Sequence, residues 1–247
     1  MGAITYTRSH MSMPPALPPP VAIVTGASRG IGRAIAHALA VAGHHVLACA
    51  RSQTALDALR TEVNHTSGRV ETLALDLASR GAGVRLVEHA LEHSGRIDVL
   101  VNNAGIAPAQ PITEATPDVL DAIHALNVRL VHETTWRAWG ALVASRGVIL
   151  NVSSLAARDP FPGFQLYGAS KAWLELYTRA IAEEGRASGV RAYALTLGAV
   201  ETPLLRGLFP DFPAADALAP GDVARLSLRL LDPAFAPASG EAIVLRR

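Results

Sequence analysis

Two side chains four residues apart, Tyr167 and Lys171, could together perform acid/base chemistry. On a helix, residues at this spacing lie on one face, so the phenol and the ammonium can meet. The ordinary pKa of tyrosine is about 10, and a neighbouring ammonium lowers that pKa toward the range useful for proton transfer near neutral pH. The pair therefore predicts a group that gives or takes a proton at a substrate oxygen. Taken alone, the same spacing is more often an exposed helix face.

The segment Thr25–Gly32 could hold phosphate groups. It lies between an expected strand and an expected helix, where glycines allow a tight turn and the helix N-terminus offers free N–H groups and the positive end of its dipole. This position favours a bound dinucleotide over the alternative, a glycine-rich turn without a ligand. The residues expected to contact the cofactor here are Gly26, Ser28, Arg29, Gly30, Ile31 and Gly32.

The end of the second expected strand indicates which dinucleotide is bound. Enzymes that use NAD need a carboxylate there to accept hydrogen bonds from the ribose hydroxyls, but the residues are Cys49-Ala50-Arg51. Arg51 and Arg29 could instead flank a 2′-phosphate, which a guanidinium binds better than any other side chain does. The sequence therefore favours NADP, although either arginine alone could be a solvated loop charge.

These motifs need a parallel sheet to bring them together. From residue 21 onward, short apolar or β-branched runs alternate with longer stretches of helical periodicity, which predicts a single-domain α/β fold: a doubly wound, parallel, seven-stranded sheet of the Rossmann type with helices on both faces. In such a sheet, ligands bind outside the carboxyl ends of the strands, where every motif above falls. The expected strands are Val21–Thr25, His45–Ala50, Val70–Leu75, Ile97–Val101, Val148–Val152, Arg191–Thr196 and Ala242–Leu245, and the expected helices include Ile31–Val41, Val84–Ser94 and Lys171–Ser188.

Composition limits the organisation and the partners. The 247 residues, half of them hydrophobic, fit one domain over residues 21–247. Residues 1–20 are expected to be disordered, because prolines crowd Met11–Pro20; Ser9-His10-Met11 resembles a cloning junction, and a disordered native terminus is the alternative. The net charge of +1 without a basic run predicts a small-molecule substrate and neither nucleic acid nor a membrane as partner. A single cysteine, Cys49, and the lack of a long apolar run predict a cytoplasmic protein.

Four motifs in order resemble the short-chain dehydrogenase/reductase family. They are the glycine turn Thr25–Gly32, Asp76-Leu77, the Asn-Asn-Ala-Gly run Asn102–Gly105 and the Tyr-x-x-x-Lys pattern Tyr167–Lys171. The resemblance extends from Val21 to about Leu231 and implies carbonyl/alcohol interconversion. The short C-terminal tail is similar to that of the NADP-dependent carbonyl reductase and 3-hydroxy acid dehydrogenase branch.

The resemblance also implies roles for further residues. Ser154, thirteen positions before Tyr167, would hydrogen-bond the substrate oxygen, and Asn127 would hold a water that connects Lys171 to solvent. Thr202 and the backbone of Val200 would hold the nicotinamide carboxamide. Besides Tyr167 and Lys171, the cofactor-binding residues that it implies are Asp76, Leu77, Asn103, Ala104, Gly105, Gly198, Val200 and Thr202.

Three other functions are weighed against this one. A non-catalytic dinucleotide sensor would not need Ser154, Tyr167 and Lys171 together. A sugar-nucleotide epimerase or dehydratase shares the tyrosine and lysine, but it needs a longer C-terminal domain than this chain has. His89 and His93 lie four apart on an expected helix, but no third ligand is near them in the sequence and the neighbouring glutamates indicate a solvated face, so no metal is expected.

Two loops are expected to form the substrate pocket, Arg158–Leu166 and Pro203–Phe212, the second closing over the site rather than forming one long helix. Their apolar side chains predict a substrate with an apolar or aromatic group; these are Phe161, Phe164, Leu166, Leu204, Leu205, Leu208 and Phe209. Packing of the loops onto the domain is the alternative.

A homodimer or homotetramer is expected because the helix of Tyr167 carries excess apolar residues, namely Ala172, Trp173, Leu176, Ala180 and Ile181.

Overall fold

A computed structural model describes residues 18–247, which contain one seven-stranded sheet in the order β3-β2-β1-β4-β5-β6-β7. Every neighbouring pair of strands is parallel, which confirms the doubly wound α/β fold. The strand order reverses between β1 and β4, and such a reversal opens a crevice at the carboxyl ends of the strands. The strands are β1 (Val21–Thr25), β2 (His45–Ala50), β3 (Arg69–Ala74), β4 (Val99–Asn102), β5 (Val148–Ser154), β6 (Arg191–Leu197) and β7 (Ala242–Leu245).

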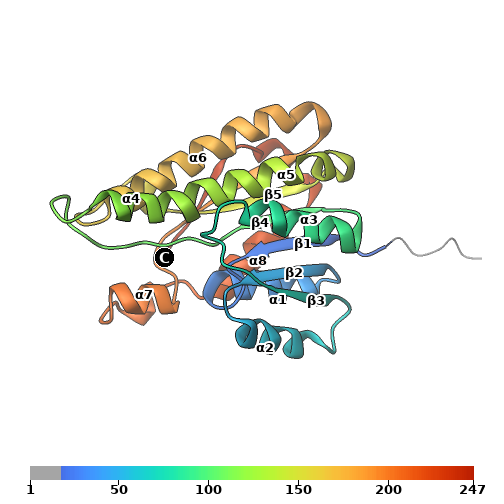
Figure 1. Cartoon of the computed structure of the whole chain (residues 1–247), viewed down its shortest axis with the longest axis horizontal. Coiled ribbons are helices and arrows are strands. Elements are labelled where there is room, and N and C mark those ends of the chain that lie inside the picture. The colour runs from blue at the N-terminus through green and yellow to red at the C-terminus, as the bar shows by residue number, and fades with distance from the viewer. Residues whose placement is uncertain (1–17) are drawn as a thin grey trace, which may run out of the picture.

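Helices cover both faces of the sheet (Figure 1). One face carries α1 (Gly30–Val41), α2 (Gln53–Val63) and α8 (Pro220–Leu230), and the other carries α3 (Ala82–Ser94), α5 (Leu130–Ser145) and α6 (Gln165–Gly185). The remaining helical segments are α4 (Pro117–Ile123), α7 (Pro203–Leu208), a π-helix (His124–Arg129) and four 3₁₀ turns (Leu155–Ala157, Arg186–Ser188, Ala214–Asp216 and Pro233–Ala238). Among the helices of residues 18–247, none has the length and apolar character that a membrane span requires.

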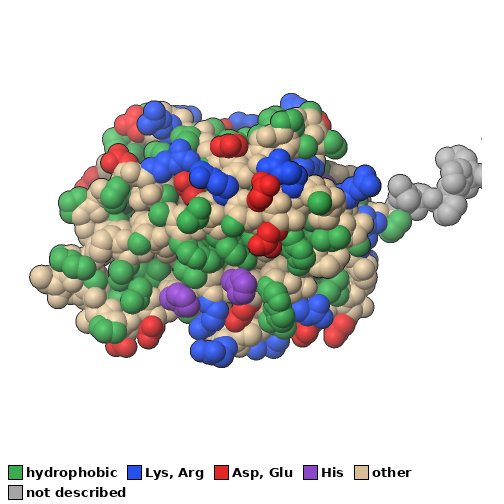
Figure 2. Space-filling view, turned by 90° about the horizontal axis from the view of Figure 1, so that it is seen from above, with side chains coloured by type: hydrophobic (Ala, Val, Ile, Leu, Met, Phe, Trp, Pro, Cys, Tyr) green, Lys and Arg blue, Asp and Glu red, His purple; other side chains and the backbone are tan. Residues whose placement is uncertain are grey.

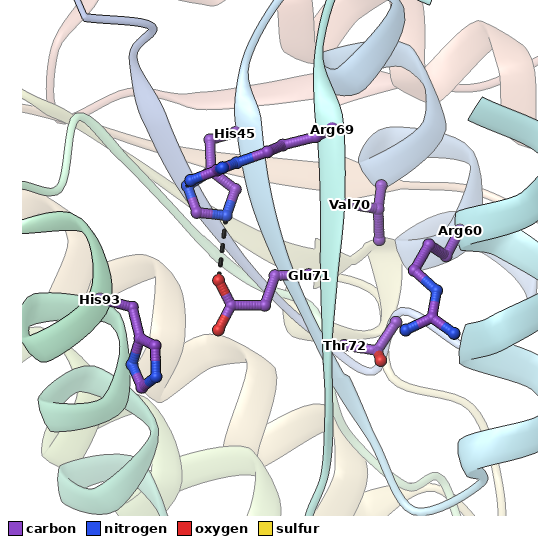
Figure 3. A pocket seen from close by; sticks show the side chains of 7 residues that line it. All are labelled: His45, Arg60, Arg69, Val70, Glu71, Thr72 and His93. Carbon is purple, nitrogen blue, oxygen red and sulfur yellow. Dashed lines mark hydrogen bonds and ion pairs between the residues drawn. The ribbon is translucent and has the colours of Figure 1, made fainter. Parts of the chain in front are cut away.

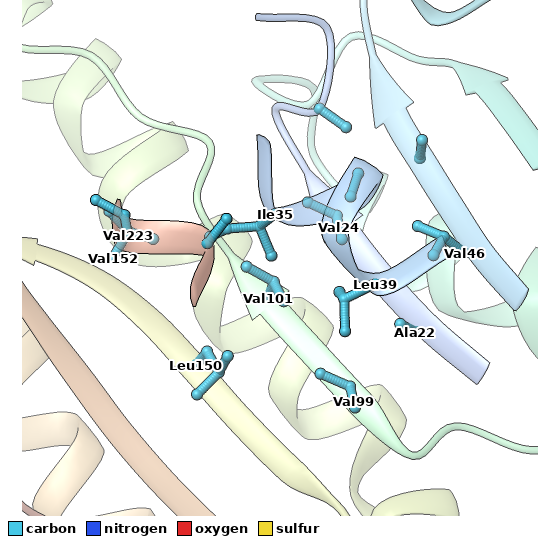
Figure 4. Packing of buried hydrophobic residues seen from close by; sticks show 14 of the residues in the cluster. Ala22, Val24, Ile35, Leu39, Val46, Val99, Val101, Leu150, Val152 and Val223 are labelled. Atoms are coloured by element: carbon cyan, nitrogen blue, oxygen red, sulfur yellow. The ribbon is translucent and has the colours of Figure 1, made fainter. Parts of the chain in front are cut away.

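The core forms two layers because side chains of a strand alternate between the faces of the sheet. Val24 of β1 faces α1, where Ile35 and Leu39 pack on the sheet (Figure 4), whereas Ile23 faces the layer of α3 and α5. All five residues of β1 are buried, as expected for a strand covered on both faces. The sheet is therefore a rigid base for the loops at the strand ends.

Several element boundaries differ from those expected. β3 lies one residue earlier, β5 and β6 run on to Ser154 and Leu197, and β4 begins at Val99 rather than at Ile97. Just before β4, the carboxylate of Asp98 accepts hydrogen bonds from the backbone N–H of Val21 at 2.7 Å and from Arg96 at 2.6 and 2.9 Å. The predicted ends of these strands were wrong by one or two residues.

The helix expected from Lys171 begins six residues earlier, so Tyr167 lies in its first turn. α6 then ends at Gly185, and Arg186–Ser188 form a 3₁₀ turn. Ile181 was expected on the exposed face of this helix, but it is buried in the core layer beneath α6.

The expected disordered segment 1–20 lies outside the described residues except for 18–20, which form neither helix nor strand.

Candidate active site

A cavity of about 970 Å³ lies at the carboxyl ends of the central strands. Of the residues predicted for the site, two do not line it: Gly32 and Asn127 are buried. The predicted residues that line it are Gly26, Ser28, Arg29, Gly30, Ile31, Arg51, Asp76, Leu77, Asn103, Ala104, Gly105, Ser154, Tyr167, Lys171, Gly198, Val200 and Thr202. The fold thus brings nearly all of them to one cavity, which is large enough for a dinucleotide and a small substrate.

At three positions in the glycine turn, the backbone conformation or the space available excludes any residue other than glycine. Gly26 and Gly30 have φ values of +69° and +57°, in the left-handed region. A Cβ on Gly32 would lie 2.3 Å from Nδ2 of Asn103. That amide donates hydrogen bonds to the carbonyl oxygens of Thr25 at 2.9 Å and Gly26 at 3.2 Å. Asn103, directly after β4, therefore braces the turn.

The N-terminus of α1 opens onto the cavity. Its N-cap residue, Arg29, gives the first turn no side-chain hydrogen bond, and that turn carries no acidic residue. The N–H groups of this turn and the positive end of the helix dipole can therefore bind an anion. Thr202 faces the same turn, since its Cγ2 atom lies 3.1 Å from the place of a Cβ on Gly30. These residues fit a pyrophosphate lying between the glycine turn and the segment after β6.

The N-terminus of a second helix, α2, lies where the 2′ position of the dinucleotide's ribose is expected. Arg51 is exposed at the end of β2, and Ser52 caps α2 by accepting a hydrogen bond from the N–H of Ala55 at 3.3 Å. Arg51, Ser52 and Ala55 all line the cavity, as does Arg29 from the other side. The nearby Ala50 is buried, and it stands where an enzyme that uses NAD would have a carboxylate. This corner of the cavity is positively charged.

Tyr167 and Ser154 line the same cavity. Ser154 ends β5, and Tyr167 comes from the first turn of α6. Burial raises the pKa of Tyr167 above its ordinary value, while a hydrogen bond with the Ser154 hydroxyl acts in the opposite direction. The predicted lowering of this pKa by Lys171 was therefore wrong for the structure as it stands, because burial outweighs the other effects and Lys171 is not among the groups that shift the pKa.

Lys171 lies one helical turn beyond Tyr167, and although it is buried it lines the cavity. Its Nζ atom donates a hydrogen bond to the carbonyl oxygen of Val152 at 2.7 Å and lies 5.7 Å from the centre of the Tyr167 ring. Burial lowers the pKa of Lys171 to about 8. The ammonium therefore lies beside the Tyr167 ring, and it releases a proton more readily than an ordinary lysine does.

Asn127 joins the loop after β4 to the catalytic helix. Its Oδ1 accepts from the N–H of Ile106 at 3.0 Å, and its Nδ2 donates to the carbonyl oxygen of Ile106 and to the hydroxyl of Ser170, both at 3.0 Å. A Cβ on Gly105 would lie 3.0 Å from Oδ1 of Asn127 and 3.8 Å from Nζ of Lys171, so both side chains border the same glycine. The side chain of Asn127 thus positions the loop; the water expected between it and Lys171 stays a prediction.

Aromatic side chains from both predicted pocket loops meet beside Tyr167. The rings of Phe161 and Phe164 lie 4.5 Å apart, that of Phe209 lies 5.8 Å from Phe164, and that of Tyr167 lies 6.3 Å from Phe164. The predicted loop residues that line the cavity are Phe161, Phe164, Leu204, Leu205, Leu208 and Phe209; Leu166 does not. This end of the cavity is therefore apolar, and the helix α7 that contributes to it is only six residues long.

Arg206 holds the second loop in shape. It pairs with Glu201 at 2.5 Å and donates hydrogen bonds to the carbonyl oxygens of Pro210 at 3.0 Å and Phe212 at 2.6 Å. Thr202 begins the same segment: its hydroxyl caps α7 by accepting from the N–H of Leu205 at 3.2 Å, and it donates to the carbonyl oxygen of Val200 at 3.1 Å. The segment after β6 is therefore ordered by its own polar side chains.

Sequence reasoning missed Glu175, a largely buried carboxylate behind the catalytic residues. It accepts hydrogen bonds from the hydroxyls of Ser153 at 3.2 Å and Thr196 at 2.5 Å, and it pairs with Arg158 at 3.0 Å. It therefore ties β5, β6 and the loop after Ser154 to α6. Its position four residues after Lys171, on the same helix face, was the signal that could have found it.

Comparison with known proteins agrees with this geometry. The sequence profile of the family described as "short chain dehydrogenase" matches residues 20–212. L-xylulose reductase of Bos taurus is 37% identical over 199 residues, which are 80% of this chain and 78% of the relative. A short-chain dehydrogenase of Pseudocercospora fijiensis is 35% identical over 187 residues, which are 74% of this chain but only 60% of that longer relative.

Solved structures share the whole fold. A 3-oxoacyl (acyl-carrier-protein) reductase of Agrobacterium tumefaciens C58 with NADP bound has a TM-score of 0.85 at 28% identity, and the match covers 92% of each chain. A 3-ketoacyl-(acyl-carrier-protein) reductase of Brucella melitensis, complexed with NADH, has a TM-score of 0.83 at 30% identity, covering 92% of this chain and 96% of the other. Similar folds thus carry either nicotinamide dinucleotide.

Proposed function

The chain belongs to the short-chain dehydrogenase family, and we propose that it is an NADP(H)-dependent oxidoreductase that interconverts a carbonyl group and a secondary alcohol. The observation that carries the proposal is the meeting of Ser154, Tyr167 and Lys171 in one cavity with the glycine turn. A bound nicotinamide would supply or accept the hydride. Tyr167 gives or takes the proton at the substrate oxygen, Ser154 hydrogen-bonds that oxygen, and Lys171 stabilises the phenolate form of Tyr167.

Small molecules are the partners that this site suits, and we propose that the protein acts in the cytoplasm without a nucleic acid partner. A dinucleotide sensor of the same fold is the alternative. It would have no use for a tyrosine and a serine that line one cavity together with a buried lysine. The assembled proton-transfer residues therefore favour catalysis.

The cofactor of the proposed enzyme is NADP(H). Arg51, Arg29 and the N-terminus of α2 surround the corner of the cavity where a 2′-phosphate would lie, and Ala50 offers no acceptor to a ribose hydroxyl. Hydrogen bonds to a charged group contribute about 1.5 to 3 kcal/mol each, which corresponds to roughly 10- to 100-fold in affinity.

The first test is a steady-state assay of aldehydes, ketones and 3-hydroxy acids with both cofactors. We expect turnover of at least one of these substrates, with a kcat/KM for NADPH at least about tenfold above that for NADH. Turnover with equal or better use of NADH would contradict the cofactor assignment alone. The lack of turnover with either cofactor, in a protein that binds NADPH, would favour the sensor.

The substrate should carry an apolar or aromatic group, because Phe161, Phe164 and Phe209 wall the cavity beside Tyr167. Replacing Leu208 and Phe209 by alanine is expected to raise KM for hydrophobic ketones roughly tenfold more than for short-chain ones, since each lost contact is worth about 1 to 3 kcal/mol. The dissociation constant of NADPH should change little. An equal effect on all substrates would mean that these side chains merely pack the loop.

We further propose a homodimer or homotetramer that associates through α5 and α6. Trp136 on α5 and Leu176 on α6 are 62% and 65% exposed, which is unusual for such large apolar side chains. Figure 2, which views the molecule from the side of these helices, shows hydrophobic side chains across this face between flanking charges. Such a face matches the apolar centre and polar rim of a protein interface.

Light scattering checks the assembly. We expect a mass of at least a dimer at micromolar concentration, and a shift toward monomer for Leu176→Glu, because the substitution would bury an unpaired charge. The matched control is Ala58→Glu, an equal change of charge at an exposed site on α2. A monomeric wild type, or equal effects of both variants, would refute this interface.

A further inference from the structure

Three metal-ligating side chains meet near the amino-terminal end of the edge strand β3, whereas the catalytic cavity lies at the carboxyl ends of the strands. They are Glu71 on β3 and His89 and His93, one turn apart on α3. One ligand atom from each lies within 4.8 Å of the others. We propose that these three residues bind Zn²⁺, independently of the catalytic site.

The distances suit a single ion. Zn²⁺ binds imidazole nitrogen at about 2.0–2.1 Å and carboxylate oxygen at about 2.0–2.2 Å, so ligand atoms around one ion lie roughly 3–4 Å from each other. Nε2 of His89 already lies 2.7 Å from Oε1 of Glu71. The imidazoles of His89 and His93 are stacked, with ring centres 4.1 Å apart. Small side-chain rotations would therefore bring all three ligand atoms to one ion.

The hydrogen bonds of the histidines leave the required lone pairs accessible. Nδ1 of His93 lies 2.8 Å from the carbonyl oxygen of His89, which can only accept, so Nδ1 carries the proton and Nε2 is free to bind a metal. In the neutral His89 ring, Nε2 carries the proton that it shares with Glu71. When Zn²⁺ binds at Nε2, the ring would carry its proton on Nδ1 instead. No change in oxidation state is needed.

A buried histidine orients the carboxylate. Nε2 of His45 donates to Oε2 of Glu71 at 3.0 Å (Figure 3), because Nδ1 of the same ring accepts from Arg69 at 3.0 Å and from the Ser94 hydroxyl at 3.1 Å. Oriented carboxylates of this kind are characteristic of protein metal sites. Oε1 of Glu71 therefore remains directed toward His89.

The site also has room for a fourth ligand. A surface depression of about 440 Å³ lies against Glu71 and His93 and is bordered by Arg60 and Arg69. A water molecule in this depression could complete the tetrahedron that Zn²⁺ prefers. Because Glu71 belongs to an edge strand and the histidines to a helix, the ion would fasten β3 to α3. Its expected effect is on stability.

Calorimetric titration of the tag-free, chelator-stripped full chain with Zn²⁺ tests the proposal. We expect one equivalent bound per chain, a higher denaturation midpoint when Zn²⁺ is present, and tetrahedral absorption bands when Co²⁺ is used instead. His89→Asn, His93→Asn and Glu71→Gln should each weaken Zn²⁺ binding at least tenfold. The control is His65→Asn, an exposed histidine outside the cluster, which should bind as the wild type does.

Two results would overturn the proposal: a wild type that binds no stoichiometric Zn²⁺ at micromolar concentration, or a folded His89→Asn/His93→Asn double variant that binds it as tightly as the wild type. Circular dichroism and NADPH binding establish that each variant is folded. If Glu71→Gln does not fold because His45 loses its partner, the exposed His93 still decides the question. Neither result bears on the proposed oxidoreductase activity, so the two proposals can fail separately.

Discussion

Replacing Tyr167 by phenylalanine is expected to lower kcat by about 10² to 10⁴-fold while the dissociation constant of NADPH stays within a few-fold of the wild-type value. The substitution removes only the hydroxyl that is proposed to exchange a proton with the substrate, in the cavity that Ser154 also lines. The ring keeps its packing against Phe164, 6.3 Å away. The loss should therefore fall on the chemical step, measured as single-turnover oxidation of NADPH.

Two variants of the same helix serve as comparisons. Tyr177→Phe makes the same chemical change ten residues later, where the ring stacks on Trp173 at 4.7 Å, and it should leave kcat close to that of the wild type. Lys171→Ala should impair both kcat and NADPH binding, because Lys171 is expected to contact the cofactor ribose as well as Tyr167. More than a tenth of the wild-type kcat in Tyr167→Phe would remove this residue from the mechanism.

The second large effect is a change of cofactor preference. In the double variant Ala50→Asp/Arg51→Ser, the new carboxylate would accept hydrogen bonds from ribose hydroxyls and would repel a 2′-phosphate, while a guanidinium that binds the phosphate is lost. We expect the ratio of kcat/KM for NADPH to that for NADH to fall by about 10- to 100-fold or more. Steady-state assays with both cofactors at one ionic strength give the ratio directly.

Arg60→Ser provides the matched control for this change, because Arg60 is an exposed arginine of α2 that does not line the cavity. It should leave the ratio unchanged. If the double variant keeps the wild-type ratio and still binds both cofactors, the corner around Arg51 and Arg29 does not bind a phosphate.

Local sequence patterns predicted the fold and most of the cavity. Strands that are buried on both faces appear as apolar runs, and the residues that follow them must share one edge of a parallel sheet, so Gly26 and Asn103 could be grouped without coordinates. Ser154 and Tyr167 were added to this group by the resemblance to the family. The glycine turn was recognisable from its place between a strand and a helix, and the structure shows the steric requirement that Gly26, Gly30 and Gly32 each meet. These features depend on residues that are close in sequence or on the order of the strands.

What could not be predicted depends on contacts between distant residues. Glu71 and His89 are eighteen positions apart, and only the packing of α3 beside β3 brings them together. Ile181 looked exposed because periodicity shows which residues share a helix face but not how much of that face the sheet covers. Glu175 was missed for a related reason, since its partners Ser153 and Thr196 come from two strands.

The π-helix that contains Asn127 has a consequence for how this site can change by insertion or deletion. An α-helix turns by about 100° per residue, so one added residue would rotate everything after it, unless a wider turn absorbs the addition locally. Here the turn His124–Arg129 does so: Asn127 reaches Ile106, while Leu130 and Thr134 at the start of α5 still face the core. Deleting one residue from this turn would restore the regular α-helical rotation. Then either Asn127 would lose its contact with Ile106, or Leu130 and Thr134 would turn away from the core. The number of residues in this turn, as much as the identity of residue 127, therefore determines where the side-chain amide of Asn127 lies.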